Sequence, residues 1–182
     1  MTPFTSMIKI IGISGKKQAG KDTLCSAIRE HYKGQSERIA FADALKEEVA
    51  KATGVTLDFI EANKPHFRLL LQAWGTDFRR WNNGENYWVA QAFKKMLDLP
   101  YSVNLIVVPD VRFRSEADYI RECGGHIIRV TCFHESSSDG HQSEVELDNY
   151  EHFYATFSNA GSINLVHDFA RTLLKQLNLQ TK

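Results

Sequence analysis

The chain has 182 residues and balances 22 Lys and Arg against 22 Asp and Glu, so its formal net charge is zero. This balance argues against a protein that coats nucleic acid or a membrane surface, because such proteins rely on excess cationic charge. With 43% hydrophobic residues the chain can bury one sizeable core, and we expect a single domain over residues 1–182.

The cysteines and the apolar runs bear on the cellular compartment expected for the protein. Cys25, Cys123 and Cys132 form no C-x-x-C pair and no disulfide-dense pattern, which favours a reducing cytoplasm. No apolar run approaches the roughly 20 residues of a membrane span. Residues 1–6 lack the basic and apolar regions of a signal peptide, so we expect a short disordered lead-in there.

An apolar segment over residues 7–13 leads into a loop that has Gly15 near its start and Gly20-Lys21 at its end. A helical pattern follows, which completes the order strand, G-x-x-x-x-G-K, helix of a phosphate-binding loop. Glycine allows the backbone N–H groups to converge on one anion, and the helix N-terminus adds its positive dipole end. A glycine-rich turn with an incidental lysine is the alternative, and the flanking strand and helix weigh against it.

The loop departs from the usual pattern at the residue after the lysine. Asp22 stands where Ser or Thr normally meets Mg²⁺, and the hydroxyl has moved one place to Thr23. We therefore expect both residues to help to organise a magnesium ion. The residues of this stretch expected to bind ATP are Gly15, Lys16, Ala19, Gly20, Lys21, Asp22 and Thr23.

The helix after the loop is expected over residues 21–33, and Gly34 is expected to stop it. His31, at the end of its apolar face, is interpreted as a partly buried helix-terminal residue and not as a catalyst. A short second strand is expected over residues 38–41, followed by a helix that Gly54 ends.

Residues 56–97 have a helical pattern throughout, with breaks at Pro65 and at residues 82–84. Helices without an intervening strand indicate an insert over one end of a sheet, and we expect an acceptor-binding region over about residues 55–98. One helix of this region is expected to have an inner face formed by Leu69, Leu70 and Ala73.

The third strand is expected over residues 104–110, ending at Pro109 because proline cannot donate to a β-ladder. A helix that Gly124-Gly125 ends is expected next, and strands are expected over residues 126–132 and 153–157. The turn 159–162 is expected to lead from the last strand into a last helix. The polar segment 133–149 is too long for an ordinary loop, and we interpret it as a lid.

Alternating strands and helices predict a parallel sheet with helices on both faces. The fold class expected is therefore a three-layer αβα fold of the P-loop NTPase type, with a central five-stranded parallel sheet, the helical insert and the lid. Ligands of such sheets bind outside the carboxyl ends of the strands, where the candidate residues of the loops converge.

Arginines are concentrated in the segments expected at this rim, and phosphoryl transfer depends on positioning and cationic charge. They are Arg68, Arg79, Arg80, Arg112 and Arg114. A solvated surface side chain is the alternative for each, with equal weight for Arg80 and Arg114.

Asp110 and Trp88 each allow a functional and a structural interpretation. Asp110, after an apolar run and a proline, resembles a Walker-B aspartate that orients Mg²⁺, and a residue capping the next turn is the alternative. Trp88 has a ring suited to stacking on a base, and a core position is its alternative. The seven histidines show no metal-ligand spacing, and His134 and His141 lack a partner at such a spacing.

The chain resembles the bacteriophage deoxynucleoside monophosphate kinases over most of its length. The resemblance rests on residues 14–23 with the aspartate after the lysine, and on residues 68–77, 87–89, 108–112 and 158–162. It implies transfer of the γ-phosphate of ATP, with Mg²⁺, to a deoxynucleoside monophosphate in the cytoplasm, that of an infected host cell for a viral protein. It also suggests a homodimer, with nucleotides and no nucleic acid or membrane as partners.

The resemblance and the residues together give the expected roles. The catalytic residues are Lys21, Arg68, Asp110 and Arg112, and the metal ligands are Asp22, Thr23 and Asp110. The acceptor-binding residues are Arg68, Gln72, Thr76, Asp77, Arg79, Trp88, Asp110 and Arg112. Asn159 is expected on the adenine side, and the lid motif contains His141, Ser143 and Glu144.

Two alternatives remain open. Animal-type phosphomevalonate kinases share the Ser-Gly-x-x-x-x-Gly-Lys-Asp loop and an ending like Glu144 to Asn149. A non-catalytic nucleotide-binding switch is the other alternative, and the presence of Lys21, Asp110 and the arginines argues against it. A GTPase is disfavoured because no Asp-x-x-Gly follows the loop and the stretch 63–66 lacks the aspartate that reads guanine.

Overall fold

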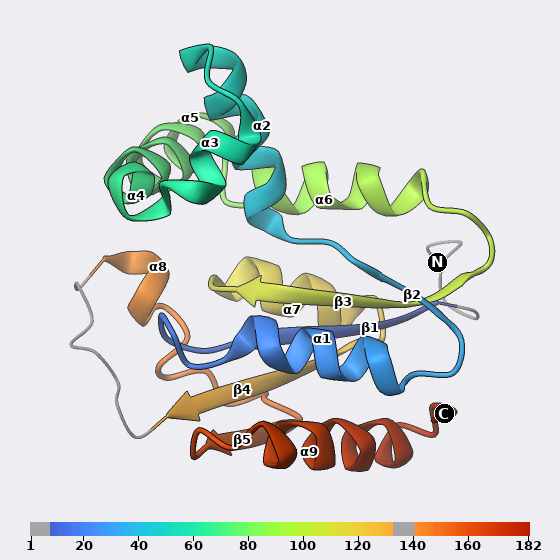
Figure 1. Ribbon diagram of the computed structural model, residues 1–182. Coiled ribbons are helices and arrows are strands. Elements are labelled where there is room, and N and C mark those ends of the chain that lie inside the picture. The colour runs from blue at the N-terminus through green and yellow to red at the C-terminus, as the bar shows by residue number, and fades with distance from the viewer. Residues whose placement is uncertain (1–7, 133–140) are drawn as a thin grey trace. The chain divides into compact units, whose positions relative to one another are not determined.

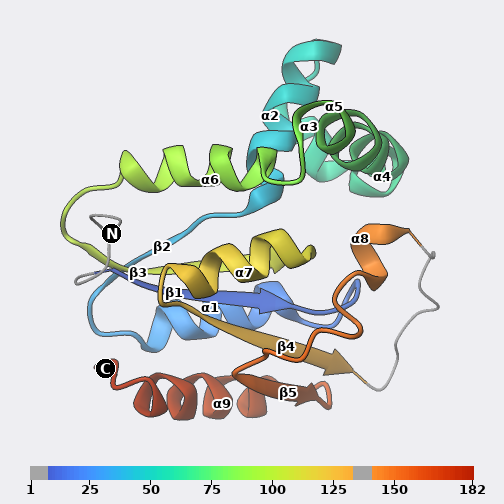
Figure 2. The ribbon, with the colours of Figure 1, turned by 180° about the vertical axis from the view of Figure 1, so that it is seen from behind.

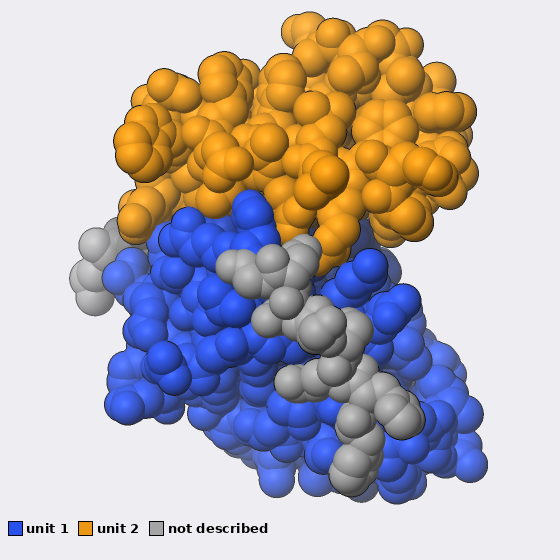
Figure 3. All heavy atoms as spheres, turned by 90° about the vertical axis from the view of Figure 1, so that its left-hand side faces the viewer, with its two compact units in different colours: residues 1–39, 99–182 blue, residues 40–98 orange. Residues whose placement is uncertain are grey.

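A computed structural model of the protein describes residues 8–132 and 141–182. The lead-in expected over residues 1–6 and the lid residues 133–140 lie outside the described residues. The chain forms two compact units, one of residues 1–39 with 99–182 and one of residues 40–98, coloured separately in Figure 3. None of the helices in the described part is long and apolar enough to cross a membrane.

The first unit contains a five-stranded sheet whose strands are all parallel, in the order β2-β3-β1-β4-β5 (Figure 1). The strands are β1 (Lys9–Ser14), β2 (Gln35–Arg38), β3 (Val103–Val111), β4 (His126–Cys132) and β5 (Ala155–Asn159). The central strand β1 is buried over five of its six residues, as expected for a strand that is covered on both faces.

Helices cover both faces of this sheet and make three layers (Figures 1 and 2). On one face, α1 (Lys21–His31) and α9 (Ile163–Gln176) pack on alternate strand residues such as Ile11 and Ile13. On the other face lies α7 (Arg114–Glu122), so close to Gly12 that an added Cβ would be 2.9 Å from Cδ1 of Ile120. The expected three-layer αβα class is confirmed.

The second unit is helical throughout its regular structure. Its helices are α2 (Phe41–Thr53), α3 (Leu57–Ala62), α4 (Lys64–Gln72), the π-helix η1 (Ala73–Arg80), α5 (Trp81–Asn83) and α6 (Tyr87–Leu97). Gly54 ends α2 with a φ of 73°, as expected. Pro65 lies in the first turn of α4, where a missing N–H costs no helical hydrogen bond.

Several predicted boundaries are wrong for local reasons. α1 ends at His31 and not at Gly34, because Tyr32 already has extended backbone with a ψ of 132°. β2 occupies residues 35–38, since an edge strand tolerates polar residues, while the apolar residues after it lead into α2. β5 begins and ends two residues later than expected.

Two further expectations fail. β3 continues beyond Pro109 to Val111, because the pairing with β1 shifts between Gly12 and Ser14 and accommodates the proline at the irregularity. The inner face expected on α4 is also wrong, since Leu69 is 79% exposed and Leu70 and Ala73 are exposed as well.

Candidate active site

The glycines of the phosphate-binding loop are required by close approach to neighbouring strands. A Cβ on Gly15 would lie 2.4 Å from the carbonyl oxygen of Val130 on β4. Gly20 has a φ of 99°, and its Cβ would lie 2.4 Å from Nδ2 of Asn159 at the end of β5. That amide nitrogen donates to the carbonyl oxygen of Ala19 at 2.9 Å. The loop therefore packs directly against the carboxyl ends of β4 and β5, and a hydrogen bond from Asn159 joins it to β5.

Lys21 begins α1 and turns its ammonium group back to the loop. Nζ donates to the carbonyl oxygens of Gly15 at 2.8 Å and Lys16 at 2.7 Å. Burial, followed by the neighbouring Arg112 guanidinium, lowers the pKa of Lys21 to about 8, although nearby carboxylates act in the other direction. A buried lysine that is readily deprotonated is a frequent feature of functional sites.

The acidic strap, residues 141–150, lies against this loop and includes the short helix α8 (Gln142–Val145). Nζ of Lys16 donates to the carbonyl oxygen of Glu144 at 2.7 Å and pairs with the carboxylate of Asp148 at 2.5 Å. The backbone N–H of Lys17 donates to Oε2 of Glu144 at 3.3 Å. The strap thus presents carboxylates to the groups of the loop that bind anions.

Two arginines complete this cationic cluster. Arg112, just after β3, forms an ion pair with Glu144, whose side chain is only 3% exposed. Arg129 on β4 donates to Oγ of Ser14 at 3.1 Å and to Oδ1 of Asp148 at 2.9 Å. Asp148 therefore bridges two cations, Lys16 and Arg129. Glu144 bridges Arg112 and the backbone N–H of Lys17, and phosphate oxygens could also satisfy these donors.

The start of α7 fixes the backbone of Arg112. A buried carboxylate, that of Glu116, accepts from the N–H groups of Arg112 at 2.8 Å and Phe113 at 3.1 Å. Asp110 precedes them on β3 and is half-buried. The carboxylate that caps these two N–H groups is therefore that of Glu116. Asp110 remains a candidate ligand for Mg²⁺.

Glu48 connects several side chains of the second unit. It accepts from Nε of Arg79 at 2.7 Å, from Nε1 of Trp74 at 3.1 Å and from the hydroxyl of Tyr87. Burial raises the pKa of the Glu48 carboxyl, but the three hydrogen bonds outweigh it and the net shift is downward. Arg79 is thus held by an ionised partner within its own unit.

Trp88 has the geometry of a core residue in that unit. Its side chain is 3% exposed, and Nε1 donates to the carbonyl oxygen of Gly75 at 2.9 Å. Arg80, expected with equal weight to be a solvated arginine, is buried and donates to the carbonyl oxygen of Glu85 at 2.5 Å. The stacking of Trp88 on a base stays a prediction.

The predicted site residues divide between the two units. The first unit carries Gly15, Lys16, Ala19, Gly20, Lys21, Asp22, Thr23, Asp110, Arg112, His141, Ser143, Glu144 and Asn159. The second unit carries Arg68, Gln72, Thr76, Asp77, Arg79 and Trp88. In the strap, His141 caps α8 by accepting from the N–H of Ser143 at 3.2 Å.

Sequence reasoning missed Arg129 and Asp148 as members of the cluster. The sequence does hold a signal for Arg129, which is the single Lys, Arg, Asp or Glu residue in the strand HIIRVTC. A charged side chain on a strand that is covered on both faces needs a partner of opposite charge. For Arg129 that partner is Asp148.

The oxygen donors near the loop fit Mg²⁺. Asp22 and Thr23 are exposed in the first turn of α1, and Asp110 offers a second carboxylate. Within residues 8–132 and 141–182, the group of three potential metal ligands lies elsewhere, at Glu30, His31 and His167. Two carboxylates and a hydroxyl suit an ion that is bound mainly through phosphates and water.

A parallel sheet with a G-x-x-x-x-G-K loop after its central strand defines a kinase fold of the P-loop type, as expected. The sequence model of the phosphomevalonate kinase family matches residues 13–126, and the chain belongs to this family. A kinase using a nucleoside triphosphate as donor is thereby established as its class.

Two curated relatives name different acceptors. The "Putative deoxynucleotide monophosphate kinase" of Acanthamoeba polyphaga mimivirus is 29% identical over 164 residues, covering 76% of this chain and 81% of that protein. The phosphomevalonate kinase of Drosophila melanogaster is 27% identical over 125 residues, covering 65% of this chain and 63% of that protein. The expected bacteriophage family is thus confirmed only as a kinase family, since the nucleotide-kinase relative is from a mimivirus.

A solved structure supports the fold. A sugar kinase from Janibacter sp. HTCC2649 superposes with a TM-score of 0.51 at 16% identity, covering 94% of this chain and 95% of that chain. At this identity the likeness supports the fold alone.

Proposed function

We propose that this chain transfers the γ-phosphate of ATP to the phosphate of a deoxynucleoside monophosphate, giving the diphosphate used for DNA synthesis. The observation that supports this most is the cluster of Lys16, Lys21, Arg112 and Arg129 around the loop, in which strap carboxylates form ion pairs with all of these cations except Lys21. A reaction between two phosphorylated ligands needs such charge more than it needs a nucleophile of the protein.

The choice of a nucleotide acceptor rests on the extent of the similarity. The mimivirus relative aligns with a larger share of this chain, and of its own length, than the Drosophila relative does. Phosphomevalonate is the second candidate acceptor, and the family match over residues 13–126 favours it specifically. Both acceptors present a phosphate, so the roles proposed for the first unit are the same in either case.

In this proposal the loop and Lys21 hold the phosphates of ATP, and Asn159 supports the loop from the adenine side. Asp22, Thr23 and Asp110 hold Mg²⁺, which neutralises phosphate charge when it is bound. Arg112 and Arg68 bind the acceptor phosphate, and the remaining acceptor-binding residues are Gln72, Thr76, Asp77 and Arg79. The stacking of Trp88 on the base is kept as a sequence-based prediction to be tested, because its ring is only 3% exposed.

The acidic strap acts as a lid in this proposal. Arrival of phosphate oxygens at Lys16 and Arg112 exchanges one anionic partner for another, so Glu144 and Asp148 are released without leaving the cations unpaired. His141 and Ser143 keep α8 formed while the strap moves. The added phosphate charge also raises the pKa of Lys21, so phosphate binding favours its protonated form.

A coupled assay of ADP release tests the proposal. ATP and Mg²⁺ would be offered with each deoxynucleoside monophosphate, each ribonucleoside monophosphate and phosphomevalonate in parallel. Turnover with one or more deoxynucleoside monophosphates is expected. Turnover with phosphomevalonate alone would move the chain to the second candidate function, and tight ATP binding without turnover would contradict both.

The homodimer suggested by the resemblance is retained as a proposal. Light scattering of the chain with and without ATP measures its molar mass directly. A mass of twice 20.7 kDa is expected, and a mass of 20.7 kDa in both conditions would contradict the dimer.

A further inference from the structure

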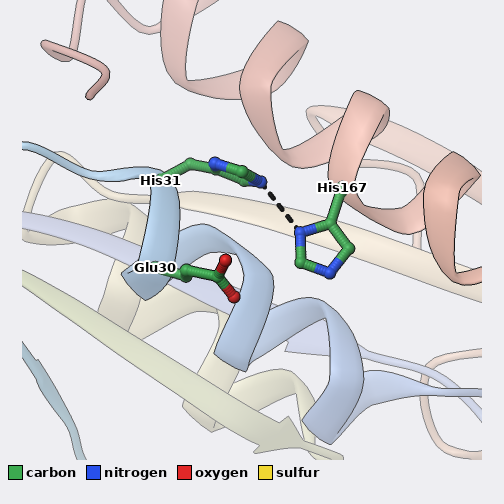
Figure 4. Close-up of side chains that lie close together, drawn as sticks. All are labelled: Glu30, His31 and His167. Carbon is green, nitrogen blue, oxygen red and sulfur yellow. Dashed lines mark hydrogen bonds between the residues drawn. The ribbon is translucent and has the colours of Figure 1, made fainter.

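Two histidines that lie 136 residues apart in the sequence meet on the surface of the first unit (Figure 4). Nε2 of His31, at the end of α1, lies 2.8 Å from Nδ1 of His167 on α9. The carboxylate of Glu30 lies beside them, and one ligand atom from each of the three residues falls within 4.8 Å of the others. Both histidines are half-buried, and Glu30 is exposed.

The neighbouring arginine indicates where the ring protons lie. Nη1 of Arg171 is 3.3 Å from Nε2 of His31. A guanidinium group can only donate, so this imidazole nitrogen is assigned as an acceptor with its lone pair directed toward its neighbours. Nδ1 of His167 then carries the proton that occupies the space between the two rings. A metal ion could replace this proton.

We propose that Glu30, His31 and His167 form a binding site for a zinc ion. Zinc–nitrogen bonds of 2.0–2.1 Å in a tetrahedral site place two ring nitrogens about 3.3 Å apart, so the rings need to separate by only about 0.5 Å. The ring proton of His167 moves from Nδ1 to Nε2, and the exposed Glu30 side chain is free to adjust. Two imidazoles and a carboxylate favour zinc over magnesium, and water completes the coordination.

The charges around the site act in both directions. Burial, together with the charges of Arg171 and His167, lowers the pKa of His31. Glu30 attracts a cation, while Arg171 repels one and is partly neutralised by Asp168 at 2.5 Å. Arg171 is therefore expected to limit the affinity and not to abolish it.

The site would join elements that are distant in the sequence. His31 ends α1, and its carbonyl oxygen accepts from the N–H of Lys182 at 2.9 Å, while Tyr32 pairs with Thr181. A bound ion would fasten α9 and this C-terminal pairing to the end of α1. Lys21 lies at the opposite end of the helix, about 15 Å away at 1.5 Å per residue, so the expected effect is on stability and not on phosphoryl transfer.

Calorimetric titration of the nucleotide-free chain with Zn²⁺, together with the melting temperature, tests the proposal. One equivalent is expected to bind and to raise the melting temperature. His31→Gln and His167→Gln should weaken this binding by at least about tenfold, and Glu30→Gln should weaken it without risk to the fold, since Glu30 is exposed. Arg171→Gln should tighten it, because a neighbouring positive charge is removed.

His66→Gln is the matched control, since His66 is exposed on α4 in the other unit and its loss should leave zinc binding unchanged. Absence of a zinc-dependent rise in melting temperature would overturn the proposal. So would equal zinc binding by the natural chain and by Glu30→Gln and His167→Gln. Spectra with Co²⁺ add a second check, because thiolate ligation to a cysteine would give a charge-transfer band that these three ligands cannot produce.

Discussion

The Glu144 carboxylate and the Arg112 guanidinium form an ion pair beside the phosphate-binding loop, joining the strap to the segment after β3. The same carboxylate accepts from the backbone N–H of Lys17. One acidic side chain therefore engages both an arginine and a loop amide that are suited to phosphate. In the free protein, phosphates have to compete with this carboxylate for the same donors.

Glu144→Gln should tighten the binding of ATP to the free protein. An amide carries no charge and competes less well for the loop N–H of Lys17 than a carboxylate does, so we expect a gain of about fivefold, equivalent to about 1 kcal/mol. Calorimetric titration of ATP without an acceptor measures this affinity. Glu146→Gln is the control, since Glu146 accepts from Gln142 within the strap. Equal affinities in both variants and the natural chain would refute the competition.

Lys21→Ala should lower kcat by about 100-fold to 1,000-fold, because it removes a positive charge that acts on the transferring phosphate. Lys17→Ala is the matched control, since the Lys17 side chain is exposed and its backbone N–H is retained. Steady-state kinetics with the accepted substrate, together with urea unfolding of each variant, separates lost chemistry from lost fold. A folded Lys21→Ala variant with an unchanged kcat would eliminate the proposed role.

The affinity for ATP should fall as the pH rises through about 8. Burial lowers the pKa of Lys21 in the folded protein to about 8, and phosphate binding requires its protonated form. Between pH 8 and pH 9 the protonated fraction, and with it the affinity, should fall by about fivefold. Lys21→Arg keeps its charge, so its affinity should lack this decline. A decline of the same size in both proteins would assign the titration to another group.

The lowered pKa of Lys21 makes ATP affinity fall with rising pH, but it makes the stability of the folded protein rise. The pKa of Lys21 lies below the unfolded value of 10.5, so the unfolded chain binds more protons between about pH 8 and pH 10.5. In that window this residue makes the free energy of unfolding rise with pH, because the buried amine no longer carries a charge. A comparison of urea unfolding at pH 7.5 and pH 9.5 in the natural chain and in Lys21→Met isolates this contribution.

Sequence reasoning could predict what local patterns determine. The phosphate-binding loop, the alternation of strands and helices and the apolar face of α1 follow from spacing. Gly54 ends α2, and Gly124 follows the C-cap of α7 with a φ of 76°, as expected. β4 was predicted to the residue, because its apolar residues Ile127, Ile128 and Val130 closely follow the glycine pair 124–125.

The remaining features depend on contacts between distant parts of the chain. The Glu144 side chain accepts from a donor 127 residues away in the sequence, and spacing does not encode such a pair. The pairing of His31 with His167 was likewise invisible, and the histidines showed no spacing typical of metal ligands. Leu69 was assigned to a core from its periodicity, although apolar periodicity does not say which face a neighbour covers.

A substitution of Trp88 can distinguish a role in the core from a role in acceptor binding. Its ring is 3% exposed, and its indole N–H donates to the carbonyl oxygen of Gly75. Trp88→Phe keeps an aromatic ring but leaves this carbonyl without that donor, which should cost about 1 to 3 kcal/mol of stability. Because the ring contacts its own unit, the KM for the acceptor should stay within about twofold of the natural value.

Trp81→Phe is the matched control, since Trp81 is 87% exposed and its replacement should leave the melting temperature unchanged. Thermal unfolding and acceptor kinetics of both variants give the required comparison. A raised acceptor KM in Trp88→Phe with an unchanged melting temperature would restore the stacking role expected from the sequence. A lowered melting temperature with an unchanged KM would assign Trp88 to the core, and the base would then have to be recognised by other residues of the acceptor-binding set.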